Sequence, residues 1–300
     1  MKNRKKTRTI HSSESMLFIY LSEMETTLAS TTIDILGLAY NGSTPVLRIK
    51  SGGTPRPVYS TPFYVENITQ QSETLIIAEY NWVESGCLEI PVQYSTDGTT
   101  WSLLGTTGDT SLTRTLQPGD KVYLRATTNA WYEHQDEFSH GCAILGVSKV
   151  GGNIMSLLYG SSFTGNETTF PTGSTANFNV LFRDNRNLVS ASELILPATI
   201  LTAGCYSYMF QYCESLTTAP ELPATTLVSQ CYRGMFEGCA NLNYIKCLAI
   251  NKSASHCTLG WVNGVAASGT FVKDPNMSEW TWGTGDNGIP SGWEVEDATE

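Results

Sequence analysis

Residues 196–216 read LPATILTAGCYSYMFQYCESL, and residues 222–242 read LPATTLVSQCYRGMFEGCANL. The second stretch repeats the first after 26 residues, with proline, cysteine, methionine, phenylalanine and leucine recurring in one register. An earlier, degenerate unit stands at residues 181–188 (LFRDNRNL), with Asn185 in the place of the second cysteine. A repeat of this length is typical of a solenoid, in which each coil buries its apolar side only by stacking on its neighbours.

The repeat predicts which side chains are buried. Equivalent positions of stacked coils lie above one another at about 4.8 Å, the spacing of strands in a sheet, so Phe210 is expected to stack on Phe236, and Leu216 on Leu242. The cysteines are expected to form a ladder of small apolar side chains, reduced and buried. The predicted repeat core consists of Cys205, Phe210, Cys213, Leu216, Cys231, Phe236, Cys239 and Leu242.

A second use of the cysteines stays open. The chain has eight of them, an even number that also permits disulfides. No CxxC pair is present, and stacked side chains usually point side by side rather than at each other. The sequence therefore favours free thiols over disulfides and over a metal site.

The chain as a whole is predicted to be mainly β. Residues 1–60 hold a basic tail and two apolar runs on either side of Asn41-Gly42, a type I′ hairpin signal because both turn residues take positive φ. Residues 51–57 (SGGTPRP) have the composition of a linker.

Two further regions follow this linker. Residues 61–150 contain short strands separated by turn signals at 95–98 and 116–120, a spacing that indicates a β-sandwich similar to immunoglobulin or fibronectin-type-III domains. Residues 151–300 are expected to form the short leucine-rich-repeat solenoid and a C-terminal cap.

Charge is unevenly distributed along the chain. The net charge is −10, yet five of the 18 basic residues lie within the first eight positions. The remainder carries 13 basic against 28 acidic residues, which argues against nucleic-acid binding by the main body. The tail is either a solvated terminus or an electrostatic anchor to a larger assembly. The predicted assembly anchor consists of Lys2, Arg4, Lys5, Lys6 and Arg8.

The repeat unit LPATxL…CYxxMFxxCxxL resembles the BspA-type leucine-rich repeat of Bacteroidales surface proteins and of the phages that infect those bacteria. Residues 149–160, 261–273 and 288–293 also resemble the segments that precede and follow the repeats in that family. The resemblance covers roughly residues 60–295 and leaves 1–60 outside. It implies a non-enzymatic role in display at a surface.

Motifs for catalysis or metal binding are weak. Gly160 and Gly165 have the spacing of a phosphate loop, but Asn166-Glu167 follows instead of Lys-Ser/Thr, which favours a simple turn. Residues 134–140 (HQDEFSH) gather imidazoles and carboxylates at a spacing that fits no standard metal site, which favours a solvated loop. No catalytic, cofactor-binding or metal-binding residue is predicted.

Four of the seven tryptophans lie near the C-terminal end. Exposed rings beside Asp286 and Asn287 would suit stacking on a sugar, whereas a solenoid also needs a cap over its last coil. Capping is favoured. The candidate ligand-binding residues are Trp280, Trp282 and Trp293.

Three classes of function follow. The first is a virion structural protein, a head or tail fibre or decoration subunit of a Bacteroidales phage that displays a host- or glycan-binding repeat domain. The second is a BspA-like adhesin on the bacterial surface, and the third is an enzyme. A polar stretch at residues 9–15 does not fit a secretion signal, and no apolar run is long enough to span a membrane, so we expect the virion. The expected partners are other virion proteins, bound through the N-terminal region, and copies of this chain in a homo-oligomer such as a trimer.

Overall fold

A computed structural model describes residues 35–41, 44–49, 60–81, 91–106, 111–126, 140–171, 177–277 and 283–299. The chain divides into two compact units, residues 1–58 and 59–300. The predicted boundary at residue 60 lies two residues from this division.

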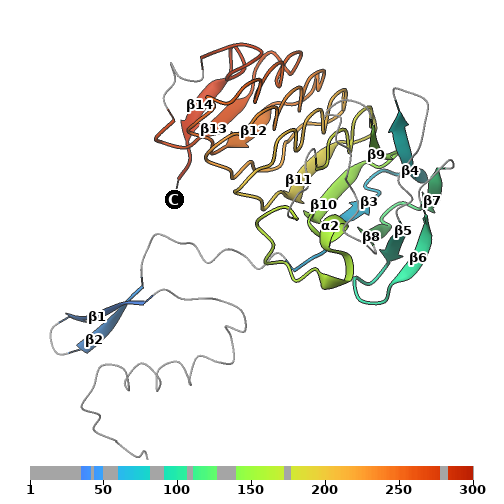
Figure 1. Ribbon diagram of the computed structural model, residues 1–300, viewed down its shortest axis with the longest axis horizontal. Coiled ribbons are helices and arrows are strands. Elements are labelled where there is room, and N and C mark those ends of the chain that lie inside the picture. Colours follow the sequence, from blue (N-terminus) through green and yellow to red (C-terminus); the bar gives the residue numbers. More distant parts are fainter. Residues whose placement is uncertain are drawn as a thin grey trace, which may run out of the picture. The chain divides into compact units, whose positions relative to one another are not determined.

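In the first unit, β1 (Ile35–Asn41) and β2 (Thr44–Ile49) form the predicted antiparallel hairpin (Figure 1). Asn41 pairs with Thr44 and so belongs to the strand, whereas the sequence placed it in the turn.

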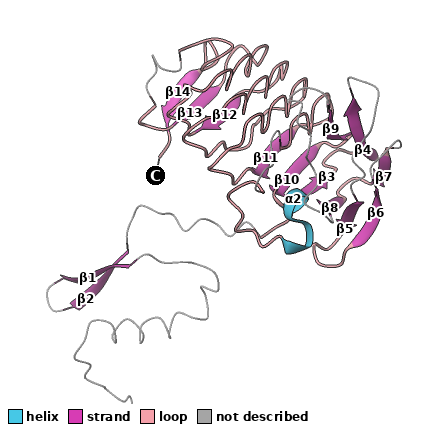
Figure 2. Cartoon of the chain, viewed as in Figure 1, coloured by secondary structure: helices cyan, strands magenta, loops and turns pink. Residues whose placement is uncertain are grey.

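The second unit is mainly β, and the short helices α2 (Ser156–Tyr159) and η1 (Gly160–Ser162) interrupt it (Figure 2). Its first part contains a six-stranded sheet of order β11-β10-β3-β8-β5-β6 and a three-stranded sheet of order β7-β4-β9. The strands are β3 (Tyr64–Glu66), β4 (Glu73–Asn81), β5 (Pro91–Ser95), β6 (Ser102–Thr106), β7 (Leu112–Leu116), β8 (Lys121–Ala126), β9 (His140–Leu145), β10 (Lys149–Asn153) and β11 (Ser190–Ile195).

Both predicted turns of this region are present. β5 and β6 pair antiparallel, and the carboxylate of Asp97 between them accepts backbone N–H groups of Thr99 and Thr100 at 2.7 Å. These hydrogen bonds, that from Thr100 first, hold the pKa of Asp97 well below its usual range. At the second turn, Gly119 has φ 84°, and the chain crosses from β7 in one sheet to β8 in the other.

β10 joins this first part to the repeats. It pairs antiparallel with β3 and parallel with β11, and four of its five residues are buried. A side chain at Gly151 would lie 2.3 Å from the Tyr64 ring, so glycine lets that ring close over the strand. The predicted boundary between residues 150 and 151 falls inside β10. Residues 59–300 are therefore one unit with a continuous hydrophobic core, rather than two separate domains.

Four segments of the repeat region stack in register. We name them coil 1 (177–185), coil 2 (205–213), coil 3 (231–239) and coil 4 (257–265); Figure 1 shows them as successive turns between β11 and the C-terminal strands. Alternate backbone N–H groups donate to carbonyls of the following coil, as in the bonds from Tyr208 to Arg233 (2.7 Å) and from Phe210 to Met235 (2.9 Å). The N–H groups between them donate to carbonyls three residues earlier, so the backbone of each coil is satisfied without helix or strand.

The opposite side of the coils is a parallel sheet. β12 (Tyr244–Cys247), β13 (Thr270–Lys273) and β14 (Glu294–Asp297) pair in that order, and single bridges from Ser190 to Thr218 and from Thr218 to Tyr244 link β11 to β12. Residues 217–226, between β11 and β12, form only isolated bridges with this sheet. In this segment Pro220 and Pro223 lack the N–H group that a sheet ladder needs.

Residues 286–288 cover coil 4. Because every coil directs N–H groups toward the next one, coil 4 needs acceptors from elsewhere. The Asn287 side-chain oxygen accepts the Gly260 N–H at 2.6 Å, and the Asp286 carbonyl accepts the Val262 N–H at 3.3 Å. This part of the predicted cap therefore satisfies the donors that stacking leaves open.

Candidate ligand-binding surface

The predicted repeat core lies where the register placed it. Phe210 stacks on Phe236 with ring centroids 5.6 Å apart, and on Phe182 of coil 1 at 5.2 Å. Leu216 and Leu242 are fully buried. Asn185 occupies the second cysteine position of coil 1 and donates to the carbonyls of Ile144 and Val147, at 3.4 and 3.3 Å, so it joins the first coil to the preceding sheets.

The four predicted core cysteines are buried and free, as are Cys247 and Cys257. The thiol of Cys213 donates to the Phe182 carbonyl at 3.0 Å, and that of Cys239 donates to the Phe210 carbonyl at the same distance. Burial raises the pKa of Cys205 to about 12, because the interior disfavours a thiolate. Cys87 and Cys142 lie outside the residues whose side chains the structure describes.

We predict that these thiols stay unreactive in the native protein. At pH 8 a thiol reagent should leave Cys205, Cys213, Cys231 and Cys239 unlabelled, because the raised pKa keeps them protonated and the coils keep reagent out. In denaturant all four should react. Peptide mass spectrometry locates the labels and separates them from any at Cys87 and Cys142; a disulfide between two repeat cysteines would contradict the ladder.

Of the three tryptophans considered as ligand-binding residues, the structure describes only Trp293. Trp293 is only 7% exposed, and its indole N–H donates to the Ala266 carbonyl at 2.7 Å. Its ring therefore serves the capping role that the sequence favoured and offers no open stacking face. Trp280 and Trp282 lie outside the described residues.

Other candidates from the sequence also lie partly or wholly outside this description. The basic residues of the proposed anchor and residues 134–139 fall outside the described ranges. At the phosphate-loop candidate, the Glu167 carboxylate accepts the backbone N–H groups of Thr164 and Gly165, both at 2.8 Å, so it occupies the donors that a phosphate would need. Across the part of the chain that the structure describes, no three His, Cys, Asp or Glu side chains gather as a metal site.

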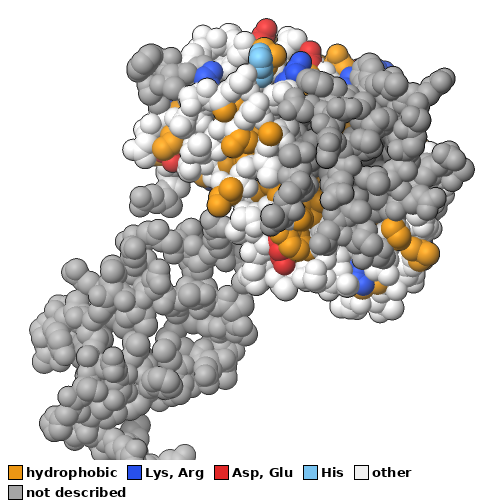
Figure 3. Space-filling model, viewed as in Figure 1, with side chains coloured by type: hydrophobic (Ala, Val, Ile, Leu, Met, Phe, Trp, Pro, Cys, Tyr) orange, Lys and Arg blue, Asp and Glu red, His pale blue; other side chains and the backbone are white. Residues whose placement is uncertain are grey.

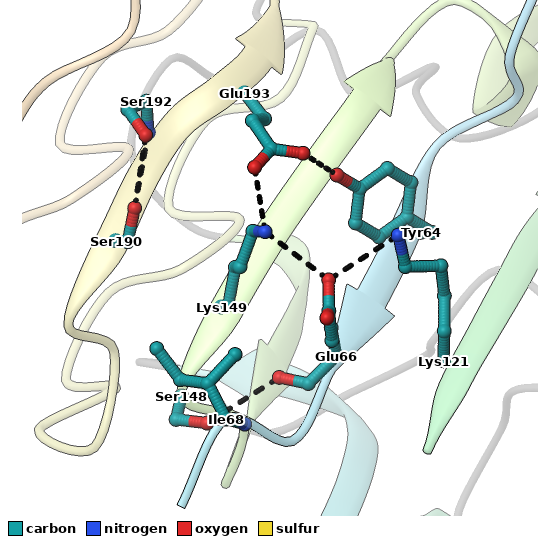
Figure 4. A network of polar contacts seen from close by, with 9 residues as sticks. All are labelled: Tyr64, Glu66, Ile68, Lys121, Ser148, Lys149, Ser190, Ser192 and Glu193. Atoms are coloured by element: carbon teal, nitrogen blue, oxygen red, sulfur yellow. Dashed lines mark hydrogen bonds and ion pairs between the residues drawn. The ribbon is translucent and has the colours of Figure 1, made fainter. Parts of the chain in front are cut away.

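A network of charged groups lies where β3, β8, β10 and β11 meet (Figure 4). Lys149 contacts Glu193 at 2.6 Å and Glu66 at 3.2 Å, and Lys121 contacts Glu66 at 3.3 Å. The Tyr64 hydroxyl donates to Glu193, and burial followed by this bond raises the pKa of Tyr64. Hydrogen bonds from Lys149 and then Tyr64 lower the pKa of Glu193. Because the groups are paired with one another, the network fastens β11 to β10, β3 and β8.

A different surface runs across coils 2 to 4. Tyr208 and Tyr212 of coil 2 pack against Gly234 and Gly238 of coil 3, where an added Cβ would lie 2.3 and 2.4 Å from their rings. In coil 4 the equivalent positions are again glycines, Gly260 and Gly264, and a Cβ there would meet no side chain of the described ranges within 4 Å. Two tyrosine rings thus stand beside a strip of bare backbone.

A row of polar side chains crosses the same coils. Gln211, Glu237 and Asn263 occupy equivalent positions in coils 2, 3 and 4. The Gln211 amide nitrogen donates to Glu237 Oε2 at 2.5 Å, and the Asn263 amide nitrogen donates to Glu237 Oε1 at 3.4 Å. We call this set the tyrosine–glycine surface: Tyr208, Gln211, Tyr212, Glu237, Gly260, Asn263 and Gly264.

Arginines flank the rings of this surface. The guanidinium carbon of Arg183 lies 5.7 and 5.9 Å from the ring centroids of Tyr208 and Tyr212, and that of Arg233 lies 5.6 Å from Tyr208. These distances fit cation–π contacts that hold the rings in place.

Sequence reasoning missed this surface. The sequence does show that Gly234 and Gly238 replace Tyr208 and Tyr212 one repeat later. Without the structure, this difference looks like ordinary variation between repeats. The tryptophans drew attention instead, because large aromatic residues near one end of a chain resemble a binding patch.

The geometry defines a mainly β protein with stacked, in-register coils and a polar–aromatic surface across them. Comparison of the chain with protein-family models, curated proteins and solved structures finds no match. In the described ranges, no helix is both long and apolar enough to cross a membrane. Figure 3 shows one face of the molecule, on which hydrophobic side chains are scattered among uncharged polar ones and charged side chains are few.

Proposed function

We propose that the protein is a non-enzymatic virion structural protein, a head or tail fibre or decoration subunit of a Bacteroidales phage. In this proposal the stacked coils are a short BspA-like leucine-rich-repeat solenoid, and the sheets before them form an immunoglobulin- or fibronectin-III-like sandwich. The coils face outward and bind the host, and the N-terminal region holds the protein in the particle as a homo-oligomer.

The division of the chain into two compact units carries this proposal. Residues 59–300 have their own continuous core, and residues 1–58 form a separate unit. A displayed protein needs one part that attaches and another that recognises, and the two units can take these roles. The five basic residues of the tail suit attachment to an acidic surface, and the strands β1 and β2 suit contacts with further strands.

The 26-residue register supports the display role of the second unit. Its side chains change along the surface of the stack while its core positions repeat, as in the pairs Tyr208/Gly234 and Phe210/Phe236. A stack of this kind is a scaffold on which surface residues are free to vary for recognition.

Deletion of the first unit tests the proposal. A chain that starts at Pro57 should keep the thermal unfolding of residues 59–300 but fail to join particles during phage assembly. A matched variant with Lys2, Arg4, Lys5, Lys6 and Arg8 changed to glutamine should join with reduced occupancy that depends less on salt than that of the wild type, because it lacks the charge attraction that salt screens over about 8–10 Å at moderate ionic strength.

Occupancy is measured by quantitative mass spectrometry of purified particles. Normal occupancy of the truncated chain would place the attachment elsewhere and remove the main support for a virion role. Recovery of the full chain from the outer surface of bacterial cells, and not from particles, would favour the adhesin.

A further inference from the structure

We propose that the tyrosine–glycine surface binds a neutral carbohydrate. Tyr212 stacks on a pyranose ring that lies over Gly264 and Gly260, and Gln211, Glu237 and Asn263 hydrogen-bond its hydroxyl groups. This inference rests on the proposed display function, for which it names the ligand class and the residues.

The backbone conformation of the tyrosines carries the first step. Tyr208 has φ 54° and Tyr212 has φ 61°, in the left-handed region that L side chains rarely adopt. The next two coils use glycine at both positions, with φ between 56° and 75°. In coil 1 the equivalent residues, Val180 and Asp184, take φ 56° and 61°, so the positive φ belongs to the coil itself. Because coils 3 and 4 stack with glycine at both positions, stacking of the coils does not require the tyrosine rings.

The exposed Tyr212 ring and the backbone of Gly260 and Gly264 beside it leave space for a pyranose ring. The Tyr212 side chain is 38% exposed although it packs against Gly238. Beyond it, among the residues that the structure describes, a Cβ at Gly264 would approach only the Gly238 backbone, at 3.6 Å, and one at Gly260 would meet nothing within 4 Å. A flat ring beside a strip without side chains suits the flat, C–H-rich face of a pyranose, which packs on aromatic rings.

The polar row supplies directed hydrogen bonds. Gln211 is only 5% exposed, and its side-chain oxygen has no hydrogen-bond partner within the described part of the chain. A buried acceptor without a donor is unfavourable, and a ligand hydroxyl supplies that donor once the Gln211 side chain turns its oxygen toward the surface. The Glu237 carboxylate between Gln211 and Asn263 adds a charged acceptor, and sugar hydroxyls are the donors that amide and carboxylate oxygens bind.

Charge argues for a neutral ligand. Arg183 and Arg233 flank the rings, whereas Asp184 beside Arg183 and Glu237 in the polar row carry the opposite charge. The positive and negative groups balance, so the surface has no net local charge to attract a polyanion such as nucleic acid.

Purified full-length protein is applied to an array of neutral hexose and N-acetylhexosamine oligosaccharides, beside acidic glycans and single-stranded DNA. The strongest neutral binder is then titrated by calorimetry. Tyr212→Gly should weaken binding at least tenfold and Glu237→Gln by a similar factor, whereas Tyr212→Phe should stay within threefold because the ring remains. Tyr244→Ala, on β12 of the strand side, is the matched control and should bind like wild type.

Glycine variants keep the test independent of folding, since coils 3 and 4 already hold glycine at this position. Tyr212→Gly should stay folded, with a single cooperative unfolding transition, because coils 3 and 4 already stack with glycine at this position. Binding of no neutral oligosaccharide, or wild-type binding by Tyr212→Gly, overturns the proposal. So does a preference for the acidic glycans or for DNA. Incorporation into particles is measured separately, so failure here leaves the virion proposal standing.

Discussion

Replacing Phe210 by alanine is expected to destabilise residues 59–300 by about 3–5 kcal/mol, the usual cost of removing a buried aromatic side chain. The Phe210 ring is fully buried and stacks on a phenylalanine on each side, Phe182 at 5.2 Å and Phe236 at 5.6 Å. Neither neighbour can close the cavity, because each is fixed by the backbone hydrogen bonds of its own coil. Phe236→Ala should cost a similar amount.

Urea unfolding followed by circular dichroism measures this loss. Ile200→Ala, at a side chain that is 68% exposed just before coil 2, is the control and should change stability by less than about 0.5 kcal/mol. Equal midpoints for Phe210→Ala and Ile200→Ala would show that the phenylalanine column is not core and that the assigned register is wrong.

Removal of Trp261 should have an effect of the same size at the other end of the stack. This fully buried ring stacks on Tyr232 with centroids 6.3 Å apart and meets Phe271 edge-on at 6.2 Å. Its indole N–H also donates to the Gly288 carbonyl at 2.7 Å, which holds the cap segment against coil 4. Trp261→Ala should therefore cost about 3–5 kcal/mol and loosen the cap.

Hydrogen exchange separates these two consequences. In Trp261→Ala the amides of Gly260 and Val262 should lose protection, since their acceptors lie on Asn287 and Asp286 of the cap. Trp261→Phe keeps most of the apolar contact but leaves the Gly288 carbonyl without this donor, and should cost about 1–3 kcal/mol. Unchanged protection in the alanine variant would mean that the cap is held by other contacts.

The local pattern of the sequence was enough to predict several elements. Asp97-Gly98 and Pro118-Gly119 mark their turns because few residues other than glycine take positive φ without strain, and both turns are present. The mainly β character followed from the same short strands and turns. The hairpin near Asn41 was also predicted, but the prediction put Asn41 in the turn, whereas Asn41 is the last residue of β1. The reason is that strand pairing, and not composition, fixes where a strand ends.

The division between the sheets and the repeats could not be predicted in this way. Val150 pairs with Val65, 85 positions earlier in the chain, and Gly151 on the same strand pairs with Glu193 of β11. Such a strand carries two neighbours that are remote in sequence, and only the packing of the whole chain selects them. A boundary drawn between the run of short strands and the repeat region therefore cut through the strand that unites both parts.

The register of the repeats and their buried positions follow from the residue pattern alone, because a 26-residue period leaves apolar residues no way to be buried except on their own equivalents. Tertiary structure decided the roles of the aromatic residues outside that core. Trp293 is a cap because the chain folds back on coil 4, and Tyr212 is exposed because Gly238 beneath it lets the ring lie on the next coil. The physical reason is that residue type sets how much apolar surface a side chain has, whereas the neighbours that the fold brings to it decide which part of that surface water still reaches.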